Sequence, residues 1–508
     1  MSLQNVIIDT DVGCDDAITI ALALNNPRLT VHAVTTVFGN VSVAQATENV
    51  RVLLKYFNHA DIPIYRGLDT DYSGVVPVID TWPGHGANGL GDHAFFPSCP
   101  PGFLPEAQSE TAPQALVRLA RARPGFYDIL ALGPLSNVAE AIRIDPQFPS
   151  LVRSLAWMGG SAIARGNVTE TAEFNAHADA PAAAACLGAF PPRAVTVVPW
   201  EATVASEIPW SALQRLAFDQ PFPPEYSGPA PGAITALAAA DAKQEQQQQQ
   251  QQQGASSDTA NSEYKSESCG MGAQAKFRFF LSRVTGAYWV FTADSTRTQA
   301  RVAAAAAGAG PLSSYLGAAR DRLARTGRCC PLMPDAKTSS SSHSSNSKCT
   351  TAKGANSADE AEVCEMCRLE GTSHAASRRG LIICDAAAYM AMAEPTVAVT
   401  GVSVAAAACV PEGPAKGTLV VDWYGRGETQ SIVDAITHAE HHSAQQQGST
   451  ATATAAASAS ASARVAGPVV SVAVAPVVRF VRGVRGQALC DAMADLAGAE
   501  RFDISTLE

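Results

Sequence analysis

The sequence predicts an α/β protein built on a doubly wound, mostly parallel sheet. Through the first 200 residues, short continuous apolar runs alternate with longer segments of helical periodicity. Parallel strands are buried on both faces, so they appear as unbroken apolar runs joined by crossover helices. The chain has 508 residues, of which 47% are hydrophobic, which is enough apolar material for a large core.

The elements of the first half can be assigned in order. The strands are expected at residues 6–8, 31–37, 129–132, 155–158 and 194–198. The helices between them are expected at residues 17–24, 44–57, 112–121, 136–142 and 180–187. In sheets of this kind ligands bind at the carboxyl ends of the strands, so functional residues are expected there.

The periodicity is less regular after residue 200. Helices are expected at 276–290 and 310–325, a buried segment at 380–392, and strands at 417–421 and 469–474. Three tracts are biased in composition: a glutamine run at 246–253, a serine-rich tract at 338–347, and glutamine followed by Ala/Ser/Thr repeats at 445–463. Such tracts bury too little apolar surface to offset their ordering entropy, so we expect disordered surface insertions.

We therefore predict a single interrupted domain rather than several domains in series. Its core comprises residues 1–240, a helical part at 271–328, a second part at 380–440 and a C-terminal part at 467–508. A Gln-rich insertion at 241–270, a Ser/Cys-rich insertion at 329–379 and a low-complexity insertion at 441–466 separate these parts.

Charge and composition argue against several classes of protein. Lys and Arg number 36 against 47 Asp and Glu, which gives a formal charge of −11 and argues against a nucleic-acid partner. The chain has no uninterrupted apolar window of about 18 residues, so no membrane-spanning helix is predicted. The N-terminus leads directly into an apolar strand without a basic region, so no signal peptide and a cytoplasmic location are expected. The 12 cysteines are scattered, as reduced core cysteines are.

Four carboxylates follow the first strand within eight residues: Asp9, Asp11, Asp15 and Asp16. Helix capping uses one or two such side chains, and capping alone is the simpler interpretation. Four clustered carboxylates repel one another unless a cation neutralises them, and Ca²⁺ and Mg²⁺ bind oxygen ligands. The cluster therefore favours a divalent-cation site.

Taken alone, the start of this cluster also resembles the signature of haloacid-dehalogenase-type phosphatases. In that family the first aspartate, here Asp9, is the nucleophile, the second, here Asp11, is an acid/base, and Mg²⁺ lies between them. The phosphatase pattern does not require Gly13, Asp15 and Asp16, and no lysine stands convincingly in the position that would bind phosphate.

The segment 9–17 closely resembles the N-terminal fingerprint of the calcium-dependent nucleoside N-ribohydrolases, the inosine/uridine-preferring nucleoside hydrolase family. Five further motifs follow in that family's order. They are FGN at 38–40, HGANGLG at 85–91, LGPLSN at 132–137, MGG at 158–160, and GNVT with EFN between 166 and 175. The resemblance is dense over residues 6–200 and thinner afterwards.

The resemblance implies a metal centre and a catalytic base. Asp11, Asp16 and Asp385, which ends the apolar run at 382–384, would bind Ca²⁺ together with the main-chain carbonyl of Leu132. Asp11 would also take a proton from the metal-bound water. Such a site makes water nucleophilic at neutral pH.

The resemblance also implies a ribose site. Asp15 would accept hydrogen bonds from the ribose hydroxyl groups, and the block from Met158 to Asn175 would bind the sugar. The full set of expected substrate-binding residues is Asp15, Asn40, Met158, Asn167, Glu173 and Asn175. Taken singly, Asn167 and Asn175 are equally typical of loops and caps. Asp179 is expected to be the N-cap of the helix at 180–187.

The leaving-group acid is the place where the chain departs from the pattern. Cys384 stands where many members of the family carry histidine, although some carry cysteine. A thiol differs from an imidazole in pKa and hydrogen bonding, which leaves His85 as the remaining candidate near the base.

The resemblance and the aspartate cluster together predict a hydrolase that cleaves the N-glycosidic bond of ribonucleosides of the inosine or uridine class, in purine and pyrimidine salvage. Two alternatives remain, the Mg²⁺-dependent phosphatase and a non-catalytic scaffold with a vestigial pocket. A complete aspartate cluster together with Asp385 argues against the scaffold. The resemblance also implies a homodimer or homotetramer. Cys329, Cys330, Cys349, Cys364, Cys367 and His374 could bind zinc, although their spacings are irregular.

Overall fold

The computed structural model describes residues 3–79, 82–96, 99–217, 271–293, 380–423, 432–434 and 477–506. Apart from the last two residues of α11, all of them belong to one compact unit, Met1–Phe291 with Arg379–Glu508. The three biased tracts, the expected helix at 310–325, the expected strand at 469–474 and the candidate zinc ligands lie outside the described residues.

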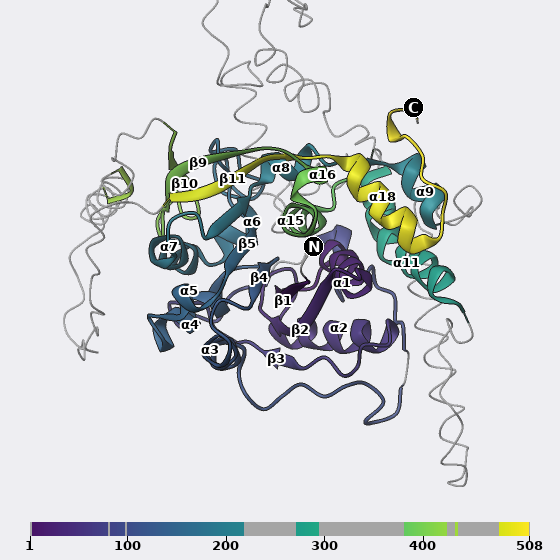
Figure 1. Ribbon diagram of the computed structural model, residues 1–508, viewed down its shortest axis with the longest axis horizontal. Coiled ribbons are helices and arrows are strands. Elements are labelled where there is room, and N and C mark those ends of the chain that lie inside the picture. The colour runs from purple at the N-terminus through teal and green to yellow at the C-terminus, as the bar shows by residue number, and fades with distance from the viewer. Residues whose placement is uncertain are drawn as a thin grey trace, which may run out of the picture. The chain divides into compact units, whose positions relative to one another are not determined.

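A sheet of nine strands forms the centre of this unit, in the order β10-β9-β11-β6-β5-β4-β1-β2-β3 (Figure 1). The pairs from β11 to β3 are parallel, and β9 runs antiparallel to both of its neighbours. The predicted mostly parallel sheet is therefore confirmed. The strands are β1 Gln4–Thr10, β2 Leu29–Thr36, β3 Ile64–Arg66, β4 Asp128–Ala131, β5 Ser154–Met158, β6 Val195–Val198, β9 Val399–Cys409, β10 Leu419–Asp422 and β11 Val477–Val484.

A second, two-stranded sheet pairs β7 (Ile208–Pro209) with β8 (Gly380–Leu381). The principal helices are α1 Cys14–Asn25, α2 Val43–Tyr56, α3 Ala112–Ala122, α4 Ser136–Ile144, α7 Ala180–Ala189, α9 Trp210–Ala217, α11 Ala273–Ala293, α15 Cys384–Ala393 and α18 Gly486–Ala497. Shorter helices are α5 Phe148–Leu151, α6 Phe174–Ala178, α8 Trp200–Val204 and α16 Pro395–Ala398, with 3-10 turns η1 Pro83–His85 and η3 Ile504–Thr506.

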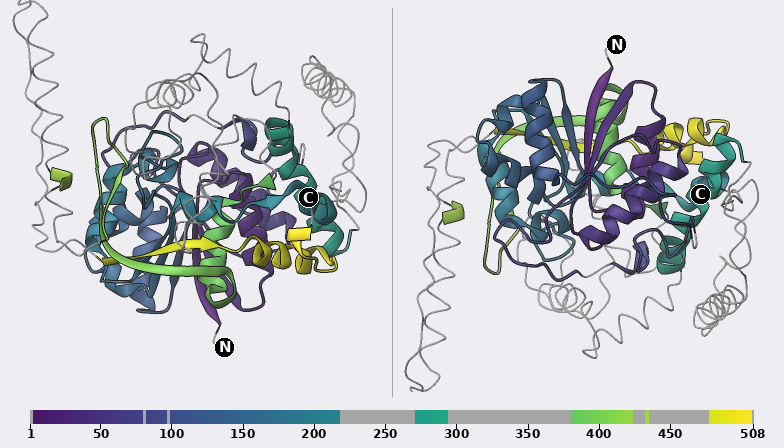
Figure 2. Two further views of the ribbon diagram at one scale, coloured as in Figure 1. Left: turned by 90° about the horizontal axis from the view of Figure 1, so that it is seen from above. Right: turned by 90° about the horizontal axis from the view of Figure 1, so that it is seen from below.

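Two apolar clusters cover the two faces of the large sheet. Val6 and Ile8 of β1 belong to the cluster that contains apolar side chains of α1, α2, α15 and α18. Ile7, between them, belongs to the cluster formed with α3, α4 and α7. Both faces of β1 are therefore buried, which explains its continuous apolar sequence. Figure 2 shows helices on both sides of the central strands.

Several elements differ from the expectation, and α9, β11 and α18 were not predicted. The buried segment at 380–392 divides into β8 and α15, and the strand expected at 417–421 is β10. The 11-residue strand β9 was not predicted, because it contains a glycine and its second half is rich in alanine, and both residues are depleted in strands. The three-residue β3 was also missed, because a run so short carries little periodicity.

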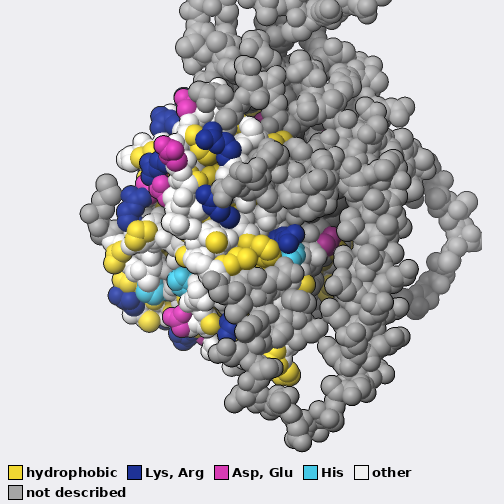
Figure 3. Space-filling model, turned by 90° about the vertical axis from the view of Figure 1, so that its right-hand side faces the viewer, with side chains coloured by type: hydrophobic (Ala, Val, Ile, Leu, Met, Phe, Trp, Pro, Cys, Tyr) yellow, Lys and Arg dark blue, Asp and Glu magenta, His cyan; other side chains and the backbone are white. Residues whose placement is uncertain are grey.

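Charged side chains of both signs are interspersed among the described residues on the face shown in Figure 3. Among the described residues, exposed ion pairs join Arg51 with Glu106 at 2.8 Å and Arg118 with Glu110 at 2.8 Å. Exposed pairs contribute little to stability, so the two apolar clusters dominate. No disulfide joins the six cysteines that the structure describes. No helix in the described part of the chain has the length and hydrophobicity needed to cross a membrane.

Candidate active site

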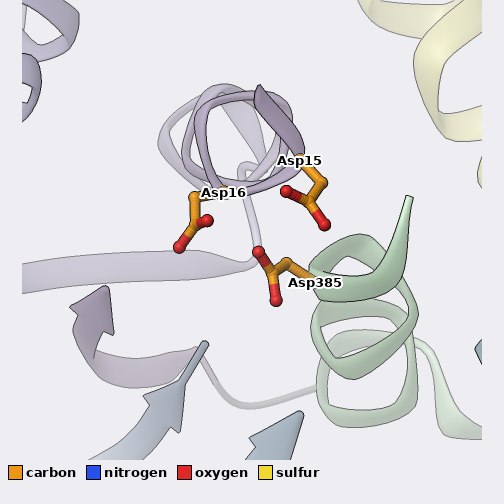
Figure 4. Close-up of side chains that lie close together, drawn as sticks. All are labelled: Asp15, Asp16 and Asp385. Carbon is orange, nitrogen blue, oxygen red and sulfur yellow. The ribbon is translucent and has the colours of Figure 1, made fainter. Parts of the chain in front are cut away.

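Three buried carboxylates converge between the first turns of α1 and α15. Asp15 and Asp16 belong to α1, Asp385 belongs to α15, and the three side chains point toward one another (Figure 4). Each offers an oxygen within 4.8 Å of the other two. Residues almost 370 positions apart in the sequence meet here, because α15 packs against α1.

Local hydrogen bonds fix the Asp16 carboxylate. Its Oδ1 accepts from the Thr10 hydroxyl at 2.5 Å, and its Oδ2 accepts from the Gly13 amide at 2.8 Å. The Asn40 side chain also donates to Oδ2, at 3.2 Å. Asp16 therefore caps its own helix and joins the end of β1 to the end of β2.

Asp11 lies beside this group, in the turn between β1 and α1. Its Oδ2 accepts from the Asn40 amide at 2.6 Å. Its Oδ1 is buried and has no hydrogen-bond partner. A Cβ atom at Gly39 would overlap this carboxylate, and one at Gly133 would lie 2.9 Å from Oδ1. The glycines of the FGN and LGPLSN motifs thus allow two main-chain segments to approach Asp11.

Burial and mutual repulsion disfavour negative charge in the cluster. Burial raises the pKa of Asp15 to about 6. Burial, followed by the negative charges of Asp16 and Asp15, raises the pKa of Asp385 well above its usual range. The same causes raise the pKa of Asp11 well above its usual range.

The donor set suits a hard divalent cation. All the side-chain ligands on offer are carboxylate oxygens, and Oδ1 of Asp11 and Oδ1 of Asp15 are buried without a hydrogen-bond partner. A cation would neutralise the repulsion and supply the missing partners. The three-oxygen group contains Asp15, which we expected to bind ribose, while Asp11, an expected metal ligand, lies next to the group.

A second network joins three of the residues expected to bind the sugar, Met158, Glu173 and Asn175. The Asn175 side chain donates to the carbonyl of Leu132 at 2.7 Å and to that of Met158 at 3.1 Å. Glu173 is the N-cap of α6 and accepts from the amides of Asn175 at 2.9 Å and Gly160 at 2.7 Å. Burial raises the pKa of Glu173 to about 7. This network links the carboxyl ends of β4 and β5.

Asn167 and Asp179 both have structural roles at helix starts. The Asn167 side chain accepts from the Phe174 amide at 2.8 Å, at the start of α6. Asp179 accepts from the Ala182 amide at 3.1 Å, which confirms it as the N-cap of α7. Asp179 also accepts from the Ser136 hydroxyl at 2.5 Å.

His85 reaches the aspartate cluster from the loop after β3. Its Nδ1 accepts from the Cys14 amide at 3.1 Å and lies 3.8 Å from Oδ1 of Asp15. Because Nδ1 is an acceptor, the neutral ring carries its hydrogen on Nε2. Burial lowers the pKa of His85 to about 4, so the ring is neutral at pH 7.

Cys384 is the first residue of α15 and is half-buried. A hydrogen bond from its main chain lowers the pKa of Asp15, which places the start of α15 against that carboxylate. The structure therefore brings both leaving-group candidates, His85 and Cys384, to Asp15.

Asp9 and Asn137 form a contact that the sequence did not reveal. The Asn137 side chain donates to Oδ1 of Asp9 at 2.7 Å and to the carbonyl of Thr36 at 2.9 Å. Thr35 donates to the same Asp9 oxygen at 2.6 Å. Asn137 belongs to the LGPLSN motif, which was the available signal, but only the fold shows which strands the side chain joins.

Comparisons with known proteins identify the family of the chain. The family model described as inosine-uridine preferring nucleoside hydrolase matches residues 6–264. A probable uridine nucleosidase 1 of Oryza sativa subsp. japonica is 38% identical over 184 residues, which are 35% of this chain and 54% of the relative. A non-specific ribonucleoside hydrolase, RihC, of Salmonella newport is 38% identical over 185 residues, 35% of this chain and 56% of the relative. The chain thus spans about half the length of these curated relatives.

A solved structure titled Inosine-Guanosine Nucleoside Hydrolase shares the fold. It superposes with a TM-score of 0.55 at 20% identity, over 98% of this chain and 99% of that one. Because the family model matches half of the sequence and the six motifs between residues 9 and 175 lie within the match, the chain belongs to the inosine-uridine preferring nucleoside hydrolase family.

Proposed function

We propose that the protein hydrolyses the N-glycosidic bond of ribonucleosides of the inosine or uridine class and releases ribose and the free base. The observation that carries the proposal is the aspartate cluster beside the Glu173–Asn175 network, at the carboxyl ends of the central strands. The relatives' names support it, because they are a probable uridine nucleosidase and a non-specific ribonucleoside hydrolase.

The cofactor in this proposal is Ca²⁺, held by Asp11, Asp16, Asp385 and the carbonyl of Leu132, with Asp15 adjacent. When bound, such a cation supplies positive charge that lowers the pKa of a water molecule. Asp11, whose buried Oδ1 has no hydrogen-bond partner, would accept the proton that this water loses.

The remaining residues bind and orient the ribose. Asp15, Asn40, Met158, Asn167, Glu173 and Asn175 form the proposed substrate-binding set. Cleavage builds positive charge on the ribose ring, and carboxylates placed beforehand around that ring stabilise it. Hydrogen bonds already hold Glu173 and Asn175, so little ordering is needed when the sugar binds.

The direct test is an assay of the purified protein with inosine, with uridine and with a phosphate monoester, each with and without a chelator. We expect reducing sugar from a nucleoside, and none in the presence of chelator. Release of phosphate would select the phosphatase, and release of neither product would select the scaffold.

The geometry does not favour the phosphatase alternative. A phosphatase of that type would use Asp9 as its nucleophile. Asp9 is fully buried, and its Oδ1 is already bonded to Thr35 and Asn137. Asp9 also lies outside the group of three converging carboxylates.

Calcium is expected to raise the melting temperature at pH 7.5 and to have little effect at pH 5. Burial raises the pKa of the cluster carboxylates above their unfolded values of about 4. Without a cation, therefore, stability falls as the pH rises from about 4 through the folded pKa values, and a cation restores it. Thermal scans with calcium and with chelator at both pH values measure this effect, and an equal shift at both would contradict it.

Cys384→His is expected to raise kcat for inosine more than kcat for uridine. The imidazole would restore an acid beside Asp15, and a purine base depends more on protonation as it leaves. The measurement is kcat for each nucleoside in the wild type and the variant, with Cys186→Ser as a control for loss of a distant buried thiol. An equal change for both nucleosides would argue against a leaving-group role for residue 384.

A further inference from the structure

Asn49 is a buried amide in α2 that the proposed mechanism does not use. It is 2% exposed. Its Nδ2 donates to the carbonyl of Val12 at 3.2 Å and to the carbonyl of Asn88 at 2.8 Å. Its Oδ1 accepts from the Gln45 side chain at 2.9 Å. The two carbonyls belong to different segments, the turn that carries Asp11 and the loop that carries His85.

The turn that carries Asp11 is strained. Val12 has φ +27°, in a region that β-branched residues rarely adopt. Such a conformation persists only where the surroundings hold it. The Val12 carbonyl accepts from Asn49, and its amide lies 3.4 Å from the Thr10 hydroxyl. Asn49 therefore supplies one of the contacts that keep Val12, and with it Asp11, in place.

The loop that carries His85 packs directly on this turn. A Cβ atom at Gly89, which has φ +80°, would lie 2.5 Å from the Val12 carbonyl oxygen. The Cys14 thiol lies beneath the loop, 3.6 Å from the carbonyl oxygens of both His85 and Gly89. The turn and the loop thus share one interface, and Asn49 is hydrogen-bonded to both sides of it.

We propose that Asn49 is a positioning residue that holds the Asp11 turn and the His85 loop in register with each other. Asn49 donates only to main-chain carbonyls, so it acts through Asp11 and His85 rather than on the substrate. Its effect on turnover rests on the proposed function, whereas its effect on the local structure does not.

The kinetic test compares Asn49→Ala and Asn49→Asp with Thr47→Val. Asn49→Asp keeps the size of the side chain and the acceptor for Gln45 but removes both N–H donors. Thr47 is a matched control: it is buried in the same helix, and its hydroxyl contacts Thr36 and Val43 instead of the site.

We expect both Asn49 variants to lose kcat by about 10²-fold, the scale for misplaced catalytic groups. Their KM should change little, because the proposed ribose ligands Glu173 and Asn175 belong to the other network. Thr47→Val should keep kcat within about twofold, because the Thr47 hydroxyl bonds to Thr36 and Val43 and to neither the Asp11 turn nor the His85 loop.

A second readout needs no activity. Cys14, under the loop, and Cys186, in α7 on the opposite face of the sheet, are both buried. Alkylation with iodoacetamide, followed by mass spectrometry of the two peptides, reports local opening at Cys14 and global opening at Cys186. In the Asn49 variants we expect the labelling rate of Cys14 relative to Cys186 to rise at least about tenfold. In Thr47→Val the ratio should not change.

Two results would overturn the proposal. One is equal acceleration of labelling at Cys14 and Cys186 in the Asn49 variants, which is global destabilisation. The other is a kcat in the Asn49 variants equal to that of Thr47→Val. If the wild type hydrolyses no nucleoside, the proposed function fails, and the labelling ratio still decides whether Asn49 holds the two segments.

Discussion

Asp11→Asn is expected to lower kcat for nucleoside hydrolysis by about 10²-fold or more, the usual scale for loss of a general base. The amide keeps the shape of the side chain and an oxygen for the hydrogen bond from Asn40. It cannot accept a proton at the position of the unpartnered Oδ1. The measurement is kcat at saturating calcium, together with calcium affinity by calorimetry. Excess calcium should not rescue the variant.

Asp179→Asn is the matched control for this change. Asp179 is also a fully buried carboxylate with hydroxyl and amide donors, but it caps α7 away from the cluster. We expect it to keep most of its turnover. If Asp11→Asn retains near-normal kcat at saturating calcium, Asp11 is not the base, and Asp15 or another carboxylate takes the proton.

Asp16→Ala is expected to fail in a different way, through weaker cation binding. The change removes a charged oxygen ligand and leaves the Asp11 carboxylate in place. The calcium concentration for half-maximal activity should rise at least about tenfold, and added calcium should recover part of the activity. Activity measured against calcium concentration, for wild type and variant, reports this shift.

Part of the activity lost in Asp16→Ala will have a structural cause, because Thr10, Gly13 and Asn40 lose the acceptor of their hydrogen bonds. Asp16→Asn keeps an oxygen for these donors and separates the two causes. If its calcium dependence equals that of the wild type, the charge of Asp16 does not contribute to cation binding, and the proposed ligand set is wrong.

The first half of the fold could be predicted because its signals are local. The strands β1, β2, β4, β5 and β6 contain short runs rich in apolar residues, and the helices expected between them start and end within a few residues of the expected positions. Asp385 was also identifiable, because it follows an apolar run and begins a helix of small residues. Its contact with Asp15 and Asp16 arises only from the packing of α15 against α1.

The remaining features depend on contacts between distant segments. β9 carries a weak strand signal and is fixed by pairing with β10 and β11. The bridge from Asn49 to Val12 and Asn88, and that from Asn137 to Asp9, join segments separated by 37 to 128 residues. The three-oxygen group contains Asp15 rather than Asp11, and this depends on how α1 meets α15 in the fold. Side-chain type and spacing alone do not determine such contacts.

The central claim, hydrolysis of a ribonucleoside, is tested most directly by the sugar product formed in the presence of phosphate. Inosine and uridine would each be incubated with the protein, calcium and phosphate, and the products analysed by mass spectrometry. The account predicts free base together with free ribose, and no product once calcium is chelated. Formation of ribose 1-phosphate, or the absence of free base from both nucleosides, would contradict it.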